Sequence, residues 1–226
     1  MTIFKQDGFT LIDVSHVVSD GMVTYKGLPA PIICDYLSRE ASKSHYDEGT
    51  SFQIGVVSLC SNSGTYVDVP FHRYLDGDDL SQIALDKLAN LEAVKIIIDP
   101  DNNKIEMSDL KDIDVKIKPF YFKPTEDRHW GSDQYFENHP FVTEEVANFL
   151  KQEGVKLVGI DSYNIDDVSG GSRPCHSVLL GGGIPICEHM TGLDQLPQDH
   201  FKFFAVPVKM KGMGTFPVRA FGLVSD

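Results

Sequence analysis

The sequence lacks the features that mark membrane, secreted and nucleic-acid-binding proteins. No stretch of its 226 residues approaches the ~20 consecutive apolar residues of a membrane-spanning helix. The first residues also lack the basic, apolar and small-residue order of a signal peptide. Asp and Glu outnumber Lys and Arg by 33 to 20, which gives a formal net charge of -13. Because phosphates and anionic lipids need a basic surface, we expect neither nucleic acid nor membrane as a partner. Since the sequence shows neither a spanning helix nor a signal peptide, we expect a cytoplasmic location.

Cysteine is scarce and scattered. The four residues, Cys34, Cys60, Cys175 and Cys187, contain no Cys-x-x-Cys pair, and we expect reduced thiols. The sequence also lacks internal repeats, low-complexity tracts and Gly/Ser-rich linkers. With 42% apolar and 23% charged residues, the composition is that of an ordinary globular protein. We therefore predict one domain over residues 1-226.

Short runs rich in Val, Ile and Phe, bounded by Gly, Pro, Asn or Asp, predict a strand-heavy chain. These runs cover residues 10–18, 51–60, 93–99, 119–123, 155–161, 184–188 and 201–210. Helix signals are fewer and lie in residues 80–91, 141–155 and 175–183. In the second of these, Thr143 is placed to cap the helix and Gly154 to end it. The prediction is a mixed α/β fold, with a long loop at 123–141 of the kind that is often functional.

The stretch SNSGTYVDVPFHRYLDG, residues 61–77, resembles half of a metal site. Asn62, Tyr66, Asp68 and His72 have the same parity, so in an extended strand they share one face. A fully extended chain would separate Asp68 from His72 by roughly 13 Å, too far for one small site. Pro70 allows the chain to bend between them. A turn in which Asp68 merely caps its own loop explains the same residues.

A second group of candidates lies in CHSVLLGGGIPICEH, residues 175–189. A short helix after His176, a turn at the three glycines and a returning strand would bring Glu188 beside His176. An imidazole with a carboxylate suits zinc or manganese. A capping histidine and a salt-bridged glutamate are the structural alternative. A Cys175–His176 nucleophile pair is disfavoured, because adjacent side chains diverge.

Together these segments resemble the cyclase-like metal-dependent hydrolases, the family of bacterial kynurenine formamidase and isatin hydrolase. NSGTYVDVPFH (62–72) is similar to the family's His-x-x-x-His-x-Asp-x-Pro-x-His signature, and HSVLLGGGIPICEHMTGLDQL (176–196) to its His-to-Glu segment. The resemblance extends nearly end to end. It implies a swivelling β/β/α domain, commonly a homodimer or larger homo-oligomer.

Carried over by position, the resemblance implies that Asp68, His176 and Glu188 bind a metal and that His72 is the catalytic base. Asn62 and Tyr66 stand where the family has the two histidines of its first metal site. Amide and neutral phenol groups are poor ligands. We therefore expect one divalent metal, zinc or manganese, rather than two. Alternatively, Asn62 and Tyr66 bond to Asp68 and hold a metal-free pocket together.

The resemblance implies hydrolysis of a small amide, formamide or lactam, in the manner of an arylformamidase. In that reaction His72 relays the proton and Tyr66 donates a hydrogen bond to the developing oxyanion. Tyr25, Trp130 and Phe136, with Asn62, are the candidates for binding a flat, possibly aromatic substrate, although each aromatic residue suits plain packing equally well. The alternative is a metal-free or catalytically altered relative that binds a small molecule or performs non-hydrolytic chemistry.

Overall fold

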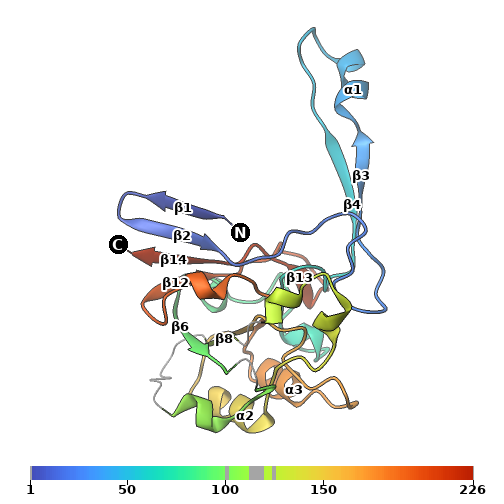
Figure 1. Ribbon diagram of the computed structural model, residues 1–226. Coiled ribbons are helices and arrows are strands. Elements are labelled where there is room, and N and C mark those ends of the chain that lie inside the picture. The colour runs from blue at the N-terminus through green and yellow to red at the C-terminus, as the bar shows by residue number, and fades with distance from the viewer. Residues whose placement is uncertain (1, 100–101, 112–119, 124–125, 226) are drawn as a thin grey trace.

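The computed structural model describes residues 2–99, 102–111, 120–123 and 126–225, and its main feature is a ten-stranded sheet (Figure 1). The strands in sheet order are β1 (Ile3–Gln6), β2 (Phe9–Asp13), β14 (Phe221–Ser225), β12 (Phe201–Phe204), β6 (Leu91–Ile97), β8 (Phe120–Lys123), β10 (Val158–Ile160), β11 (Ile186–Glu188), β5 (Tyr66–Asp68) and β13 (Thr215–Pro217). Strands β6, β8, β10 and β11 run parallel, and the flanking pairs are antiparallel. The mixed, strand-rich fold class predicted from the sequence is confirmed.

The remaining elements are short. Two further strand pairs join β3 (Ile32–Leu37) with β4 (Ile54–Ser58), and β7 (Lys104–Ile105) with β9 (Phe141–Val142). The α-helices are α1 (Arg39–Ser42), α2 (Glu144–Gln152) and α3 (Pro174–Gly181). The 3₁₀ turns are η1 (Lys43–His45), η2 (Pro70–His72), η3 (Leu85–Lys87), η4 (Met107–Leu110), η5 (Glu126–His129), η6 (Asp133–Phe136) and η7 (Leu193–Gln195). In the described part of the chain, no helix has the length and apolar character needed to cross a membrane.

Two apolar cores bury the two faces of the sheet. One packs α2 and α3 against β6, β10 and β11, through side chains such as Leu150, Leu179 and Ile186. The other gathers residues of β2, β5, β11 and β12, including Val67 and Cys187. Neighbouring residues of β11 thus enter opposite cores, because successive side chains of a strand point to opposite faces. This alternation places Tyr66 and Asp68 on the face of β5 opposite to Val67.

Two of the three predicted helices form, and one does not. Residues 141–155 contain α2, which ends at Gln152, two residues before Gly154 with its φ of 71°. The Thr143 hydroxyl does not cap this helix but donates to the carbonyl of Ile105 at 3.0 Å. Residues 175–183 contain most of α3.

The helix predicted for residues 80–91 is wrong, since only the turn η3 forms there. The backbone of this stretch bonds to distant segments instead: Leu80 donates to Met213, and Leu88 accepts from Ala205. Between the last residue of β8 and the first residue of β9, the described residues of the predicted loop at 123–141 contain only the turns η5 and η6.

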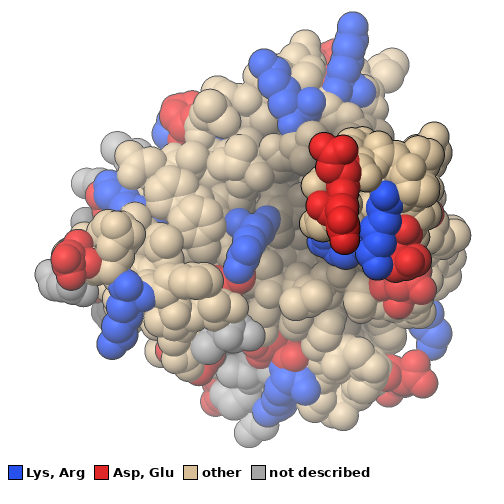
Figure 2. All heavy atoms as spheres, turned by 90° about the horizontal axis from the view of Figure 1, so that it is seen from above, with Lys and Arg blue, Asp and Glu red and all other residues tan. Residues whose placement is uncertain are grey.

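A long hairpin arm projects from the body of the molecule (Figure 1). It consists of β3, β4 and the α1 and η1 turns at its tip, and it carries exposed apolar side chains along its length. Figure 2 views the face that bears the arm; charged side chains of both signs are interspersed there on a largely uncharged surface. An isolated two-stranded hairpin is marginally stable in water. The apolar side chains of the arm lie outside both apolar cores.

Candidate metal centre and catalytic cleft

The register of three neighbouring strands assembles the floor of the site. In the antiparallel pair of β5 and β11, Tyr66 lies directly opposite Glu188. On its other side β5 pairs with β13, where Asp68 lies opposite Thr215. Directly opposed side chains in antiparallel strands are within contact distance. The Tyr66 hydroxyl accordingly donates to Glu188 Oε2 at 2.7 Å, and the Thr215 hydroxyl donates to Asp68 Oδ1.

A tight turn brings His72 back to Asp68, as the bend at Pro70 predicted. Pro70 opens η2, and the His72 amide donates to the carbonyl of Val69 at 2.8 Å. As a result His72 Nδ1 lies 3.5 Å from Asp68 Oδ1. Gly214 makes room for this turn: a Cβ at that position would lie 2.2 Å from the His72 amide nitrogen.

His176 enters the site from the first turn of α3, oriented by Asp166. Asp166 accepts hydrogen bonds from the backbone amides of Cys175 and His176, two donors that the helix itself leaves unpaired. The same carboxylate lies 2.6 Å from His176 Nδ1. When His176 is neutral and donates from Nδ1 to Asp166, the lone pair of its Nε2 faces the site. A carboxylate behind an imidazole is the arrangement that orients metal-binding histidines.

The carboxylates and imidazoles converge at distances that suit a metal ion. His176 Nε2 lies 3.5 Å from Asp68 Oδ2 and 3.9 Å from Glu188 Oε1. Asp68 Oδ2 is buried and accepts no hydrogen bond. Ligand atoms ~2.0–2.2 Å from a tetrahedral ion stand roughly 3.3–3.6 Å apart. The donor set of one imidazole and two carboxylates therefore fits a divalent cation.

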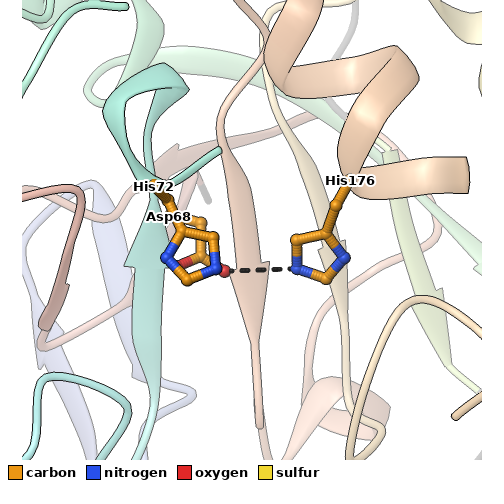
Figure 3. Close-up of side chains that lie close together, drawn as sticks. All are labelled: Asp68, His72 and His176. Atoms are coloured by element: carbon orange, nitrogen blue, oxygen red, sulfur yellow. Dashed lines mark ion pairs between the residues drawn. The ribbon is translucent and has the colours of Figure 1, made fainter. Parts of the chain in front are cut away.

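His72 also lies within reach of this centre. Asp68, His72 and His176 can each place a ligand atom within 4.8 Å of the others. Figure 3 shows His72 and His176 facing each other across Asp68, one from the turn after β5 and the other from α3. Asp68 and His176 are thus common to two possible ligand sets, one completed by Glu188 and the other by His72.

Proton positions follow from the hydrogen bonds around Thr215. The hydroxyl has one proton and donates it to Asp68. It must then accept from His72 Nδ1, which lies 2.8 Å away. His72 consequently carries its proton on Nδ1, and its Nε2 is free to accept one. Since 35% of the His72 side chain is exposed, it can also exchange protons with water.

The electrostatics of the buried groups reflect their crowding. Burial, together with the charge of Asp68, raises the pKa of Glu188 to about 7, although His176 opposes this. Burial would lower the pKa of His176, but Asp166 and Asp68 outweigh it and raise this pKa to about 10. Burial would raise the pKa of Asp68, yet the neighbouring imidazoles of His176 and His72 hold it below its ordinary value.

Asn62 and Tyr66 form a hydrogen-bonded chain that ends on Glu188. The Asn62 side chain bonds to the Tyr66 hydroxyl, which in turn donates to Glu188 Oε2. Burial, with the nearby charges of Glu188 and Asp68, raises the pKa of Tyr66 well above its ordinary value, so the phenol is neutral. The alternative in which both side chains bond to Asp68 is wrong for Tyr66, whose hydroxyl donates to Glu188 instead.

The site opens into a cleft of about 250 Å³. Its lining residues are Tyr25, Leu28, Asn62, Tyr66, His72, Arg73, Asn164, Arg173, His176 and Glu188. Two aromatic residues predicted to bind substrate do not line it. Trp130 stacks on His16 with ring centroids 3.7 Å apart, and Phe136 packs against Tyr163 at 5.1 Å and lines a separate cavity. Local sequence does not show which side of a loop an aromatic ring will face.

Sequence reasoning missed four residues of the site. Asp166 and Thr215 hold the two imidazoles, and Arg73 and Arg173 line the cleft. The adjacency of Arg73 to His72 and the position of Arg173 at the start of a predicted helix were available signals. The roles of Asp166 and Thr215 depend on long-range pairing that no local pattern reveals. The four cysteines are free, and Cys175 is buried with its thiol donating to the carbonyl of Val142 at 3.0 Å.

Comparison with known proteins places this site in a family. Residues 12–167 match the model of the family described as "Putative cyclase". The chain belongs to the cyclase family. The matched range contains the strand and turn that carry Tyr66, Asp68 and His72, and it confirms the resemblance seen in the sequence.

Relatives of this cyclase-family chain cover nearly its whole length. It is 26% identical over 216 residues to the kynurenine formamidase of Bacillus cereus, and the match covers 92% of this chain and 95% of the relative. Isatin hydrolase A from Labrenzia aggregata superposes with a TM-score of 0.81 at 17% identity, covering 96% of this chain and 94% of the other. A structure described as a potential metal-dependent hydrolase with cyclase activity superposes with a TM-score of 0.78 at 22% identity. The match covers 96% of this chain and 99% of the other. These structures share the fold of this chain.

Proposed function

We propose that this chain is a one-metal hydrolase of a small amide, formamide or lactam, similar in activity to an arylformamidase. The observation that carries the proposal is the convergence of Asp68, His176 and Glu188 at the base of an open cleft, where Asp68 Oδ2 is buried without a hydrogen bond. Kynurenine formamidases, whose name denotes cleavage of a formamide, are relatives along 92% of the chain. The isatin hydrolase fold supports the same class of reaction.

Asp68, His176 and Glu188 would hold the metal, either zinc or manganese. The two carboxylates balance the charge of a divalent ion, and Asp166 orients the imidazole. Glu188 is the better third ligand because it is buried, whereas His72 is partly exposed and tied to Thr215. A divalent ion bound there would lower the pKa of a water molecule and polarise the carbonyl of the substrate.

The side chains around the centre supply the proton transfers. His72 is the base, because its Nε2 is unprotonated and the residue lies beside Asp68 at the wall of the cleft. Once charged, it is stabilised by Asp68 and returns the proton to the leaving nitrogen. Tyr66 is neutral and borders the cleft, and we assign it the hydrogen bond to the developing oxyanion, for which its single proton turns from Glu188 to the substrate. Tyr25 and Asn62 line the space for the substrate.

Replacement of one ligand tests the proposal. Asp68→Ala is expected to abolish both metal binding and formamide hydrolysis, because it removes the carboxylate between the two imidazoles. Asp86→Ala, which alters an exposed carboxylate paired with Lys156, is the control and should retain both. Turnover of an aryl-formamide by purified Asp68→Ala would overturn the mechanism.

The replaced first metal site favours a second candidate function. The neutral side chains of Asn62 and Tyr66 occupy the positions of the family's two histidines, and the Tyr66 hydroxyl donates to Glu188. A metal-free or altered relative, binding a small molecule or performing non-hydrolytic chemistry, would have such a site. A protein that binds no metal and turns over no amide, yet holds a small molecule in the cleft, would support this alternative. Full hydrolysis in a strong chelator would instead indicate a metal-free enzyme.

We further propose that the chain forms a homodimer or larger homo-oligomer through the arm of β3 and β4. Tyr36, Ile32 and Val57 on the arm are 77, 59 and 58% exposed. Burial of such side chains would stabilise an assembly by about 25 cal/mol per Å² of apolar surface. Tyr36→Lys combined with Val57→Lys is expected to yield monomers in light scattering. An unchanged mass would refute the role of the arm.

We propose one domain over residues 1-226, because strands from both ends of the chain, β1 and β14, belong to the same sheet. The cytoplasmic location stays a prediction from the sequence.

A further inference from the structure

We propose that the cleft recognises a carboxylate on its substrate, and that Arg73 and Arg173 bind this group. The inference deepens the proposed function, since the carboxylate would accompany the amide that is cleaved. The recognition itself does not depend on turnover. It therefore admits a test that is separate from the test of hydrolysis.

Both arginines are positioned by the elements that carry the two imidazoles. Arg73 directly follows His72 and closes the turn η2. Arg173 is the N-cap of α3, three residues before His176, which corresponds to an axial rise of ~4.5 Å. The Tyr74 hydroxyl donates to the carbonyl of Ser177 at 2.8 Å and ties the two elements together. Both arginines line the same cleft as the centre.

Neither arginine is neutralised by the protein. Among the described residues, no carboxylate oxygen lies within 4.0 Å of the guanidinium of Arg73 or of Arg173. Arg219, by contrast, pairs with Asp13 at 2.8 Å. In a chain with 33 acidic and 20 basic residues, two unpaired arginines in one cleft need an explanation. A planar guanidinium matches the geometry of a carboxylate, which it binds through two parallel hydrogen bonds.

Arg173 is held in place without losing its charge. Its Nη1 donates to the carbonyls of Asp167, Gly170 and Ser172 at 3.3, 2.8 and 2.7 Å. These neutral acceptors fix the guanidinium, which has five N–H donors in all. A pre-oriented cation loses less side-chain freedom when an anion binds.

The charges of the whole cleft favour an anion. With a divalent ion bound, Asp68 and Glu188 would balance its charge and Asp166 would face His176, so the positive charges of Arg73 and Arg173 would remain uncompensated. A cleft of about 250 Å³ accommodates a small molecule. The expected substrate is therefore a small amide with a carboxylate a few bonds from the carbonyl that is attacked.

The test compares two compounds that differ only in the carboxylate, 3-formamidobenzoate and formanilide. Wild-type protein should have the higher kcat/KM on the anionic compound. Arg73→Gln should lower that value about 10- to 100-fold, the range of a lost charge-assisted hydrogen bond, so that the preference for the anionic compound over formanilide is lost. Arg173→Lys retains the charge and should lower kcat/KM on 3-formamidobenzoate less than Arg173→Gln does. Arg219→Gln removes an equal charge outside the cleft and should leave kcat/KM on both compounds unchanged.

Calorimetry with benzoate separates this inference from the proposed function. Benzoate should bind the wild-type protein and bind Arg73→Gln at least about 10-fold more weakly, whether or not any amide is hydrolysed. Binding of benzoate with this dependence, in a protein without turnover, would refute the hydrolase and support the recognition of carboxylates. Three results would overturn the inference: equal kcat/KM on the two formamides, no benzoate binding, or binding of phenyl phosphate but not benzoate.

Discussion

The replacement Tyr66→Phe removes one hydroxyl from the centre and leaves the ring in place. That hydroxyl is buried and donates to Glu188 Oε2 at 2.7 Å, while it accepts from Asn62. Its loss leaves Glu188 with the backbone amide of Ile165, at 2.6 Å, as its remaining donor. A hydrogen bond to a charged group contributes about 1.5–3 kcal/mol. We therefore expect the free energy of unfolding to fall by that amount.

Urea denaturation of the two proteins measures this change. For a domain of this size, about 1.5–3 kcal/mol corresponds to a Tm lower by about 3–12 °C. Tyr36→Phe is the matched control, because it removes a phenol hydroxyl from the arm, outside the centre, and keeps the ring that the proposed assembly would bury. Its unfolding free energy should change by less than about 0.5 kcal/mol. If Tyr66→Phe destabilises the protein no more than Tyr36→Phe does, the hydrogen-bonded chain through Tyr66 does not support Glu188.

Three further predictions concern the same centre. Asp166→Asn should weaken metal binding about 10- to 100-fold, measured by competition with a chromophoric chelator; unchanged affinity would show that Asp166 does not orient His176. Gly214→Ala should displace His72, since its Cβ would lie 2.2 Å from the His72 amide nitrogen, so kcat on a formamide should fall while bound metal is retained; wild-type kcat would refute this positioning. The double replacement of Asn62 and Tyr66 by His should raise the metal content to about two ions per chain, as elemental analysis would show, whereas an unchanged content would mean that these positions no longer form a metal site.

Local patterns predicted the main parts of the centre. The common parity of Tyr66 and Asp68, with Pro70 after them, indicated a strand followed by a bend, and the structure has both. The glycines after α3 allowed the return of Glu188 to His176, which lie 3.9 Å apart. These features follow from chain geometry over fewer than twenty residues, where sequence patterns are informative.

Contacts between distant segments were beyond the reach of these patterns. Thr215 meets Asp68 across 147 positions of sequence, and only the register of β13 with β5 brings them together. The apolar spacing in residues 80–91 suggested a helix, yet backbone pairing with residues near 205 and 213 decides that segment. Trp130 resembled a pocket residue but stacks on His16, because packing partners are set by the whole fold.

Metal content per chain is the measurement that tests the central claim most directly. Protein purified without chelators or affinity metal would be incubated with zinc and manganese, desalted and examined by elemental analysis, beside Asp68→Ala, His176→Ala and the control His45→Ala, whose histidine lies in the turn η1 of the arm. The account predicts about one ion per chain in the wild type and the control, and none in the other two. A wild-type protein that holds no metal, or one whose metal survives both replacements, would contradict it.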